Sequence, residues 1–273
     1  MIDDNKKRYK KLKEKKLFLF DIDGTLALGD DLLPGSREVL EYLKENDKQF
    51  YFTTNNSTRS AADFVKYFAQ WGIQTQEEQF LTAGLMAILY CKERFAEQKI
   101  YLVGTPSLRE AMTGAGLHIV EEYDEEVVCV LVAFDTTLQF HKLEDASRIL
   151  TNPDVKFLAT NPDLCCPTTF GAVPDCGSIC MMLENATGRK PYYIGKPEPA
   201  IVKECCRRSG CKKKDAVMVG DRIYTDILCA KNAGIDALVV FSGETDRKEG
   251  EETKIWIPFA MEGMQELAEF LKM

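Results

Sequence analysis

The sequence predicts an α/β fold with a largely parallel sheet. Short apolar runs alternate along the chain with amphipathic helical stretches, and the last third repeats this alternation. The run Leu17-Phe18-Leu19-Phe20 is apolar at every position, which is typical of a parallel strand buried on both faces. We find no internal repeat and no low-complexity linker, so composition alone marks no domain boundary.

Apolar spacing and turn residues give the other elements in order. In the stretch 36–45, Val39, Leu40 and Leu43 fall on one helical face, and Pro34-Gly35 stands just before it. Residues 161–177 are rich in Pro, Gly, Asp and Thr, a composition that predicts loops. Further strands are expected at 50–52, 99–103, 127–134, 157–159, 216–219 and 236–241, and further helices at 61–71, 108–115, 143–150, 178–186, 199–208, 225–232 and 261–271.

The charge balance excludes some classes of partner. The formal net charge is −8, and nucleic-acid binding depends largely on Lys and Arg, so no nucleic acid is expected. A small anion remains a suitable partner if the fold supplies a locally positive site. No apolar run approaches the roughly 18–20 residues that cross a bilayer, so no membrane partner is expected.

Residues 1–16 form a basic leader, dominated by Lys and Arg from Asn5 to Lys16. The segment lacks the small-residue cleavage pattern of a signal peptide. A membrane-attracted basic helix and a solvated leader are the two interpretations. The polar residues leave little apolar face for insertion and favour the solvated leader.

The ten cysteines are expected to be free thiols, because a chain of 273 residues can build a core without disulfides. Cys129 and Cys229 lie in apolar runs and read as core thiols. There are only two histidines and no repeated C-x-x-C, so a structural zinc site is not expected. A reducing cytoplasm is the simplest location.

Two carboxylates follow the first strand, in the segment Asp21-Ile22-Asp23-Gly24-Thr25. Acids at the end of a buried strand repel each other and are costly to desolvate, and a cation relieves both effects. Mg²⁺ suits this role because it takes oxygen ligands and bridges carboxylates to phosphate oxygens. The alternative is a loop in which the aspartates cap a helix or turn.

Two polar segments follow other apolar runs. Thr54, Asn55 and Asn56 come after the strand at 50–52, where hydroxyl, amide and backbone N–H groups can bind an anion. Capping of the next helix is the alternative for these residues. Lys196 follows the run 192–194 and can supply the positive charge that an anion requires, although most lysines are solvated surface groups.

A second acidic pair follows the strand at 216–219. Asp221 comes directly after Gly220, and Asp226 lies five residues further on. We interpret Asp221 as a metal ligand and Asp226 as a support that orients ligands or metal-bound water. The alternative is a helix cap followed by an acid in the next turn. Each signal is ambiguous alone, but ligands collect beyond the carboxyl ends of parallel strands, and all four segments are expected there.

The four segments together resemble the motifs of the haloacid dehalogenase (HAD) superfamily, in the same order. Further segments, Thr160-Asn161-Pro162-Asp163 and Gly195-Lys196-Pro197, resemble the NagD or 4-nitrophenylphosphatase-like branch, subfamily IIA. This resemblance runs from about Leu17 to the C-terminus. It implies a Rossmann-like parallel-sheet core, residues 1–84 and 186–273, interrupted by a large α/β cap at residues 85–185.

The resemblance also implies an activity, that of a Mg²⁺-dependent phosphatase acting on a small phosphorylated metabolite. Asp21 is expected to attack phosphorus, while Asp23 protonates the leaving oxygen and later deprotonates water. Asp21, the Asp23 carbonyl and Asp221 would hold the metal. Thr54, Asn55, Asn56 and Lys196 would hold the phosphate.

The resemblance leaves the substrate and the assembly open. Sugar phosphates, phosphoglycolate, pyridoxal phosphate and nucleotides are all compatible with it, as are a monomer and a cap-mediated homodimer. Cys166, in the loop 163–177, is the candidate for substrate contact in the cap. For Asp175 the alternatives are contact with a substrate hydroxyl and a turn, and the turn is favoured. The alternatives are a phosphotransferase or phosphomutase on the same core, and a non-catalytic phospho-receiver; Asp23 argues against the receiver, which needs no proton shuttle.

Overall fold

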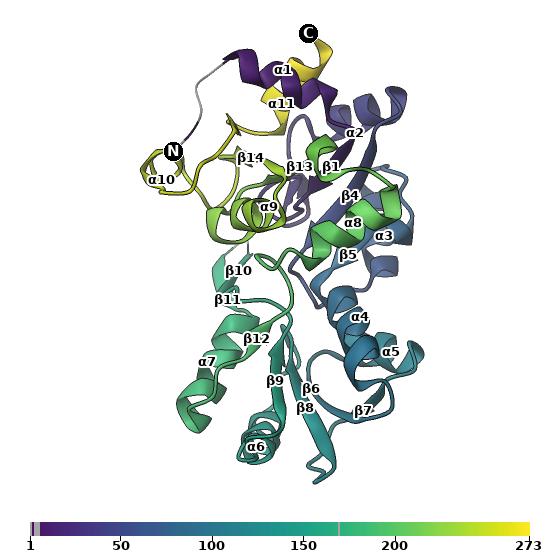
Figure 1. Cartoon of the computed structure of the whole chain (residues 1–273), viewed down its shortest axis with the longest axis vertical. Helices are drawn as coiled ribbons and strands as arrows, with labels where there is room; N and C mark the ends of the chain where they lie inside the picture. Colours follow the sequence, from purple (N-terminus) through teal and green to yellow (C-terminus); the bar gives the residue numbers. More distant parts are fainter. Residues whose placement is uncertain (1, 3–5, 169) are drawn as a thin grey trace. The chain divides into compact units, whose positions relative to one another are not determined.

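The computed structural model describes residues 2, 6–168 and 170–273, and it divides into two compact units (Figure 1). The first unit comprises Met1–Thr54, Val65–Leu81 and Lys196–Met273, and the second comprises Asn55–Phe64 and Thr82–Gly195. The expected insertion, 85–185, falls wholly within the second unit, which also takes in 55–64 and the ends 82–84 and 186–195.

The first unit is built on a six-stranded sheet in the order β15-β14-β13-β1-β4-β5. The pairs that β1 forms with β13 and β4, and the pairs β13–β14 and β14–β15, are all parallel. This confirms the predicted α/β fold. The strands are β1 (Leu17–Phe20), β4 (Gln49–Thr54), β5 (Phe80–Thr82), β13 (Ala216–Gly220), β14 (Asp236–Val240) and β15 (Phe259–Met261).

Helices cover this sheet, with α2 packed against α11 and α8 packed against α9 (Figure 1). Leu17, Phe18, Leu19 and Phe20 are each fully buried, as the unbroken apolar run predicts. The helices are α2 (Ser36–Glu45), α3 (Ala61–Gln70, of which 65–70 belong to this unit), α8 (Ala200–Ser209), α9 (Leu228–Ala233), α10 (Arg247–Glu252) and α11 (Met264–Lys272), with a small hairpin of β2 (Ala27–Leu28) and β3 (Asp31–Leu32).

The basic leader is not a solvated segment throughout. Its residues Lys6–Glu14 form helix α1, in which Leu12 is fully buried. Tyr9 Oη donates to Ala260 O at 2.9 Å and accepts from Ala260 N at 3.0 Å, so α1 is fixed to the edge strand β15. The sequence did not predict this contact, because the segment is rich in lysine. Two side chains, Tyr9 and Leu12, are enough to anchor the helix.

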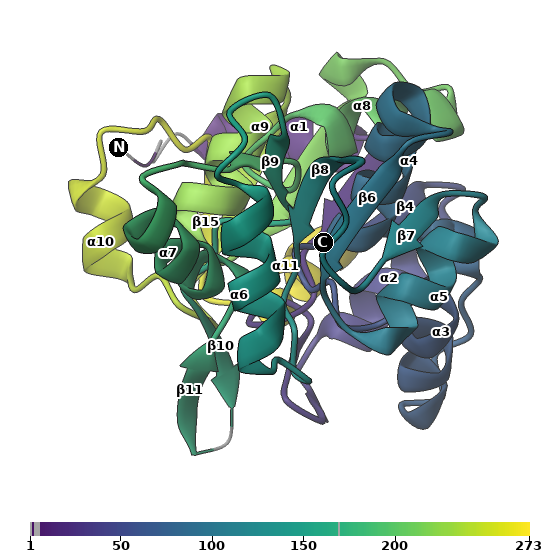
Figure 2. The same cartoon turned by 90° about the horizontal axis from the view of Figure 1, so that it is seen from below.

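The second unit has its own five-stranded sheet, in the order β12-β9-β8-β6-β7, with parallel pairs throughout. Figure 2 shows α6 and α7 side by side, and both pack near the fully buried Val130 and Val132 of β8. The elements are α4 (Ala83–Phe95), β6 (Lys99–Val103), α5 (Pro106–Gly114), β7 (His118–Val120), β8 (Val127–Val132), α6 (Phe140–Ile149), β9 (Lys156–Ala159), α7 (Cys176–Thr187) and β12 (Tyr192–Tyr193).

Three features of this unit differ from the sequence predictions, and one of them is the short strand β7, which was not expected. Residues 161–177 are not all loop, since β10 (Cys165–Thr168) pairs antiparallel with β11 (Gly171–Pro174). The helix α4 was missed because its first part, Ala83 to Cys91, is so apolar that it shows no clear helical period.

All ten cysteines are free, as expected. In the described part of the chain, no helix is long and apolar enough to cross a membrane.

Candidate active site

The candidate active site of the first unit lies where its central strands end. Asp21 follows β1, Thr53 and Thr54 end β4, and Asp221 follows β13, and these three strands are neighbours in the order β13-β1-β4. The backbone N–H of Asp21 still donates to Val219 O at 2.9 Å, which continues the parallel pairing up to the site. The rule that parallel strands gather functional groups at their carboxyl ends therefore holds for these segments.

Lys196 reaches the same place by another route. The strand before it, β12, belongs to the sheet of the second unit, so Lys196 does not end a strand of the site's own sheet. Its side chain is 1% exposed, and its Nζ donates to Asp21 Oδ1 at 2.5 Å, to Asp226 Oδ1 at 2.6 Å and to Thr53 O at 2.9 Å. Three acceptors use all three N–H bonds of the ammonium group.

Three carboxylates, those of Asp21, Asp221 and Asp226, each offer an oxygen within 4.8 Å of the others. The Asp221 oxygens accept from Thr25 Oγ1 at 3.1 Å and from the backbone N–H of Glu244 at 2.8 Å. Asp226 Oδ2 accepts from the backbone N–H of Arg222 at 3.1 Å. The cluster therefore holds three buried acids, two of which, Asp21 and Asp226, are bonded to Lys196.

A π-helical turn places Asp226. The segment Ile223–Ile227 begins two residues after Asp221 and leads into α9, where the sequence predicted an ordinary helix at 225–232. Such wide turns insert an extra residue into a helix and are frequent at functional sites. Asp226 is fully buried, and its contact with Lys196 shows that it orients the lysine as well as the loop.

The glycines of the site make room for Asp221. Gly24 has φ +86°, and a Cβ there would lie 2.5 Å from Asp221 Oδ2. A Cβ on Gly243 would lie 2.1 Å from the same oxygen. Side chains at these positions would displace the carboxylate, so both glycines are required by close approach.

The electrostatics of the cluster reflect its excess of acids. Burial raises the pKa of Asp21 well above its usual range, and Lys196 only partly opposes this. Burial and the neighbouring Asp226 raise the pKa of Asp221 to about 6, against the hydrogen bond from Glu244. Burial disfavours the ammonium form of Lys196, but Asp21 and Asp226 outweigh it and raise the pKa of this lysine.

This donor set fits a divalent cation. Mg²⁺ prefers oxygen ligands, and the acids carry more negative charge than Lys196 neutralises. Asp21 and Asp221 are the suitable ligands. Asp226 is held by the charged Lys196 at Oδ1 and by Arg222 N at Oδ2, whereas the donors to Asp221, Thr25 Oγ1 and Glu244 N, are uncharged. Asp23, half-buried in the turn bridged to Ala27, is not one of the three clustered acids.

The other predicted residues lie in the second unit, so they are described within it. Asn55 Nδ2 donates to Asp163 Oδ2 at 2.7 Å, and Asn56 Oδ1 accepts from Thr58 N at 2.9 Å. Cys166 lies in β10 opposite Val173 and packs against the core of that unit. Asp175, assigned to a turn, accepts from Cys176 N and is the N-cap of α7.

Sequence reasoning missed the loop after β14 and the role of Thr25. Glu244 N donates to Asp221, and Ser242 Oγ donates to Gly24 O at 2.8 Å. The position of this segment could have indicated its role, since Ser242-Gly243-Glu244 follows β14, another strand of the same sheet.

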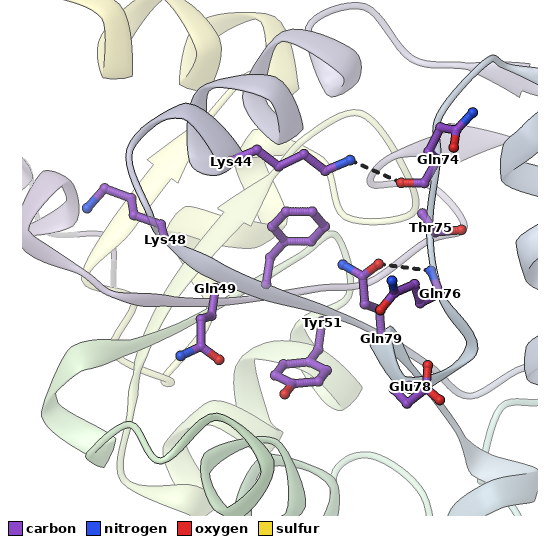
Figure 3. A pocket seen from close by; sticks show the side chains of 10 residues that line it. Lys44, Lys48, Gln49, Tyr51, Gln74, Thr75, Gln76, Glu78 and Gln79 are labelled. Carbon is purple, nitrogen blue, oxygen red and sulfur yellow. Dashed lines mark hydrogen bonds between the residues drawn. The ribbon is translucent and has the colours of Figure 1, made fainter.

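A cavity of about 540 Å³ lies elsewhere in the first unit, at the start of β4 (Figure 3). Several of its polar groups are already bonded within the protein, for example Lys44 Nζ to Gln74 O at 3.0 Å and Gln76 N to Gln79 Oε1 at 3.0 Å. It holds none of the acids described above, so we do not identify it with the active site.

The fold and the cluster define a class, that of Rossmann-like hydrolases with an aspartate facing a buried lysine. Comparison with known proteins places the chain within this class. Residues 18–118 match the family model of haloacid dehalogenase-like hydrolases, and residues 193–267 match a second HAD-hydrolase-like model. An acid sugar phosphatase of Staphylococcus epidermidis is 33% identical over 232 residues, covering 85% of this chain and 88% of the relative.

Solved structures agree with this placement. A 4-nitrophenylphosphatase from Thermotoga maritima superposes with a TM-score of 0.88 and 39% identity, covering 95% of this chain and 98% of that one. A glycerol phosphate phosphatase from Mycobacterium tuberculosis, solved in complex with magnesium, superposes with a TM-score of 0.86 and 27% identity. The match covers 93% of this chain and 76% of that one. The chain belongs to the haloacid dehalogenase-like hydrolases, in their NagD and 4-nitrophenylphosphatase-like branch, and it is an enzyme of the phosphatase class.

Proposed function

We propose that this chain hydrolyses small phosphate monoesters with the help of Mg²⁺, through an aspartyl-phosphate intermediate, an acyl phosphate formed on Asp21. The observation that carries the proposal is the contact of Lys196 Nζ with Asp21 Oδ1 at 2.5 Å inside the cluster of three acids. A buried carboxylate at the end of a strand, held by a lysine and followed by Gly24, is suited to attack on phosphorus.

The lysine has two tasks in this reaction. Its charge reduces the repulsion between the Asp21 carboxylate and an anionic phosphate, which would otherwise oppose their approach. Its bonds to Asp226 and Thr53 O hold the ammonium group in place, so its position is set before substrate binds.

Proton transfer is assigned to Asp23. In the first step Asp21 Oδ attacks phosphorus, the ester oxygen leaves, and Asp23 gives that oxygen its proton. In the second step Asp23 takes a proton from water, the water oxygen attacks phosphorus, and Asp21 is released with inorganic phosphate. Asp23 is half-buried in the turn after β1, which allows it to exchange protons with solvent.

The metal would be held by Asp21, Asp221 and the backbone carbonyl of Asp23. When bound, it supplies positive charge to the phosphate oxygens and to the surplus of acids. The magnesium complex of the glycerol phosphate phosphatase supports Mg²⁺ as the metal. The related acid sugar phosphatase supports sugar phosphates as the first substrates to test.

The test is release of inorganic phosphate from a panel of esters, with 4-nitrophenyl phosphate and several sugar phosphates, with Mg²⁺ and with a chelator. The wild type is expected to release phosphate only with Mg²⁺, and Asp21→Asn is expected to release none above background. Asp154→Asn, at an exposed acid of the second unit, is the matched control and is expected to keep wild-type activity. Equal release by wild type and Asp21→Asn would refute the proposal, and transfer to an added alcohol in place of water would indicate a phosphotransferase.

A further inference from the structure

Buried polar side chains of the second unit form a connected network around Asn55. Asp163 Oδ2 accepts from Asn55 Nδ2 at 2.7 Å and from Asn161 Nδ2 at 2.9 Å. Asn161 Nδ2 also donates to Asp175 Oδ1 at 3.2 Å. Asp163 is 1% exposed and Asn161 is fully buried, so these bonds are shielded from water.

The network fixes the base of the β10–β11 hairpin. Asp163 stands two residues before β10, and Asp175 directly follows β11. Asp175 N donates to Leu164 O at 3.0 Å, and Gly177 N donates to Asp163 O at 2.8 Å. A Cβ on Gly177 would lie 2.3 Å from Pro162 O, which shows how closely the two ends of the hairpin approach.

The same network also holds the segments next to two residues of the active site. Asn55 directly follows Thr54, and Gly195 directly precedes Lys196. Gly195 N donates to Thr160 O at 2.7 Å, and a Cβ on Gly195 would lie 2.7 Å from Asn55 Oδ1. The side chain of Asn55 is therefore fixed by Asp163 at its nitrogen and closely packed by Gly195 at its oxygen.

Hydroxyl contacts extend this arrangement. Ser57 Oγ lies 3.2 Å from Thr160 Oγ1 and accepts from Phe134 N at 3.1 Å. Thr160 Oγ1 lies 2.8 Å from Asn161 Oδ1. The segment 55–57 is thus tied at several points to the segment 160–163, which is more than 100 residues away in sequence.

We propose that Asp163 is a positioning residue, which holds Asn55 and through it the backbone that carries Thr54 and Lys196. The inference rests on the proposed phosphatase function and adds a specific role to it. The side-chain amide of Asn55 then acts by binding Asp163, and its effect on phosphate binding is indirect. The alternative, in which Asn55 donates directly to phosphate from its side chain, predicts a different response to mutation.

The test exchanges the two side chains. Asp163→Asn places two amides face to face, and Asn55→Asp places two buried carboxylates face to face. The double variant restores one amide and one carboxylate between positions 55 and 163 with donor and acceptor reversed, but Asn161 Nδ2 then loses its acceptor at position 163. Either single variant loses the hydrogen bond that holds Asn55 and is expected to lose about tenfold or more in kcat/KM for 4-nitrophenyl phosphate.

The double variant is expected to recover about threefold over Asn55→Asp, because the contact between positions 55 and 163 reforms while the bond from Asn161 does not. Inhibition by inorganic phosphate is measured on the same proteins and is expected to weaken in the single variants by a similar factor. If Asn55 bound phosphate directly, the carboxylate of Asn55→Asp would repel it, and Asp163→Asn would not restore activity. A double variant no better than Asn55→Asp overturns the inference.

A matched control separates positioning from general destabilisation. Asp135 is another buried acid of the second unit, bonded to Lys142 Nζ at 2.6 Å and to Thr137 N at 2.8 Å. Asp135→Asn is expected to lower the Tm as Asp163→Asn does, but to keep kcat/KM within about twofold. Equal kinetic losses in both variants overturn the inference alone, whereas an inactive wild type refutes the proposed function and the inference with it.

Discussion

Asp226 Oδ1 lies 2.6 Å from Lys196 Nζ, and both side chains are buried. The sequence separation is only 30 residues, yet Lys196 follows a strand of the second unit while Asp226 lies in a π-helical turn after β13. Asp226 shares the lysine with Asp21, so the charge on Lys196 is divided between two acids. This relationship gives Asp226 a role beyond supporting a metal ligand.

Asp226→Asn is expected to lower kcat/KM at least tenfold with little change in the Mg²⁺ concentration required. The variant removes one anionic partner of Lys196 and leaves the ammonium group less firmly held, while Asp21 and Asp221 remain as ligands. Breaking a buried ion pair also costs stability, on the order of 3 kcal/mol. Steady-state kinetics at several Mg²⁺ concentrations and thermal unfolding check both effects, and a large shift in the Mg²⁺ requirement would instead make Asp226 a metal ligand.

Addition of Mg²⁺ is expected to raise the Tm of the wild type. The cation binds the folded cluster and relieves the repulsion among buried acids, so it stabilises the folded state in proportion to its occupancy. In Asp221→Asn the shift is expected to be much smaller, because a principal ligand is lost. Calorimetry of both proteins with Mg²⁺ and with chelator measures this, and an equal shift in both would remove Asp221 from the metal site.

Gly24→Ala is expected to abolish most activity. The added Cβ would lie 2.5 Å from Asp221 Oδ2, and the backbone at φ +86° is strained for alanine. Gly116→Ala is a matched control, since Gly116 has φ +87° with no heavy atom within 4 Å of its built Cβ. Backbone strain is expected to lower the free energy of unfolding of both variants by about 1 kcal/mol, but only Gly24→Ala is expected to lose activity. Comparable activity in the two would show that the close approach to Asp221 does not matter.

The sequence was sufficient to predict the parts of the fold that follow from local pattern. The apolar run 17–20 became β1 with the predicted bounds, and the helix at 36–45 became α2 with the predicted bounds. Burial on both faces of a parallel strand leaves an unbroken apolar run, so such strands are visible without a structure. Acids and hydroxyls that follow such strands could also be placed together, because the carboxyl ends of parallel strands lie at the same edge of the sheet.

Other parts depend on contacts that no local pattern contains. The contact between Asn55 and Asp163 joins residues 108 positions apart, and only the folded second unit brings them together. Glu244 contributes through its backbone N–H, which every residue except proline has, so its side chain gave no signal. Asp226 was assigned a supporting role, but the π-helical turn that points it at Lys196 could not be predicted from its spacing.

Glu204→Gln is expected to lower stability at pH 7 by about 1 kcal/mol, with the difference lost in acid. Glu204 Oε2 accepts from Arg207 Nε at 2.7 Å and Oε1 accepts from Arg208 Nε at 2.8 Å. The hydrogen bond from Arg207, followed by that from Arg208, lowers the pKa of Glu204 to about 2, although burial opposes this. The stabilisation is therefore present above about pH 4.5 and is lost as pH falls from there towards 2.

Chemical denaturation of wild type and Glu204→Gln between pH 2 and 7 measures this dependence. Glu41→Gln, at an exposed position of α2, is the control and is expected to change stability little at any pH. A deficit in Glu204→Gln that stayed constant down to pH 2 would show that packing, rather than charge, explains the effect.

Tyr9→Phe is expected to destabilise the first unit by about 1–2 kcal/mol while leaving the aromatic contacts of α1 in place. The hydroxyl both donates to Ala260 O and accepts from Ala260 N, so its removal leaves two backbone groups of the edge strand β15 without these bonds. The ring itself packs edge-on against Phe259 at 5.4 Å, and phenylalanine keeps that contact. Urea denaturation, with Tyr42→Phe on α2 as the control, measures the loss. Because β14 separates β15 from the site strands β13, β1 and β4 in the sheet, kcat is expected to stay unchanged. A Tyr9→Phe protein as stable as wild type would mean that α1 does not hold β15 through this hydroxyl.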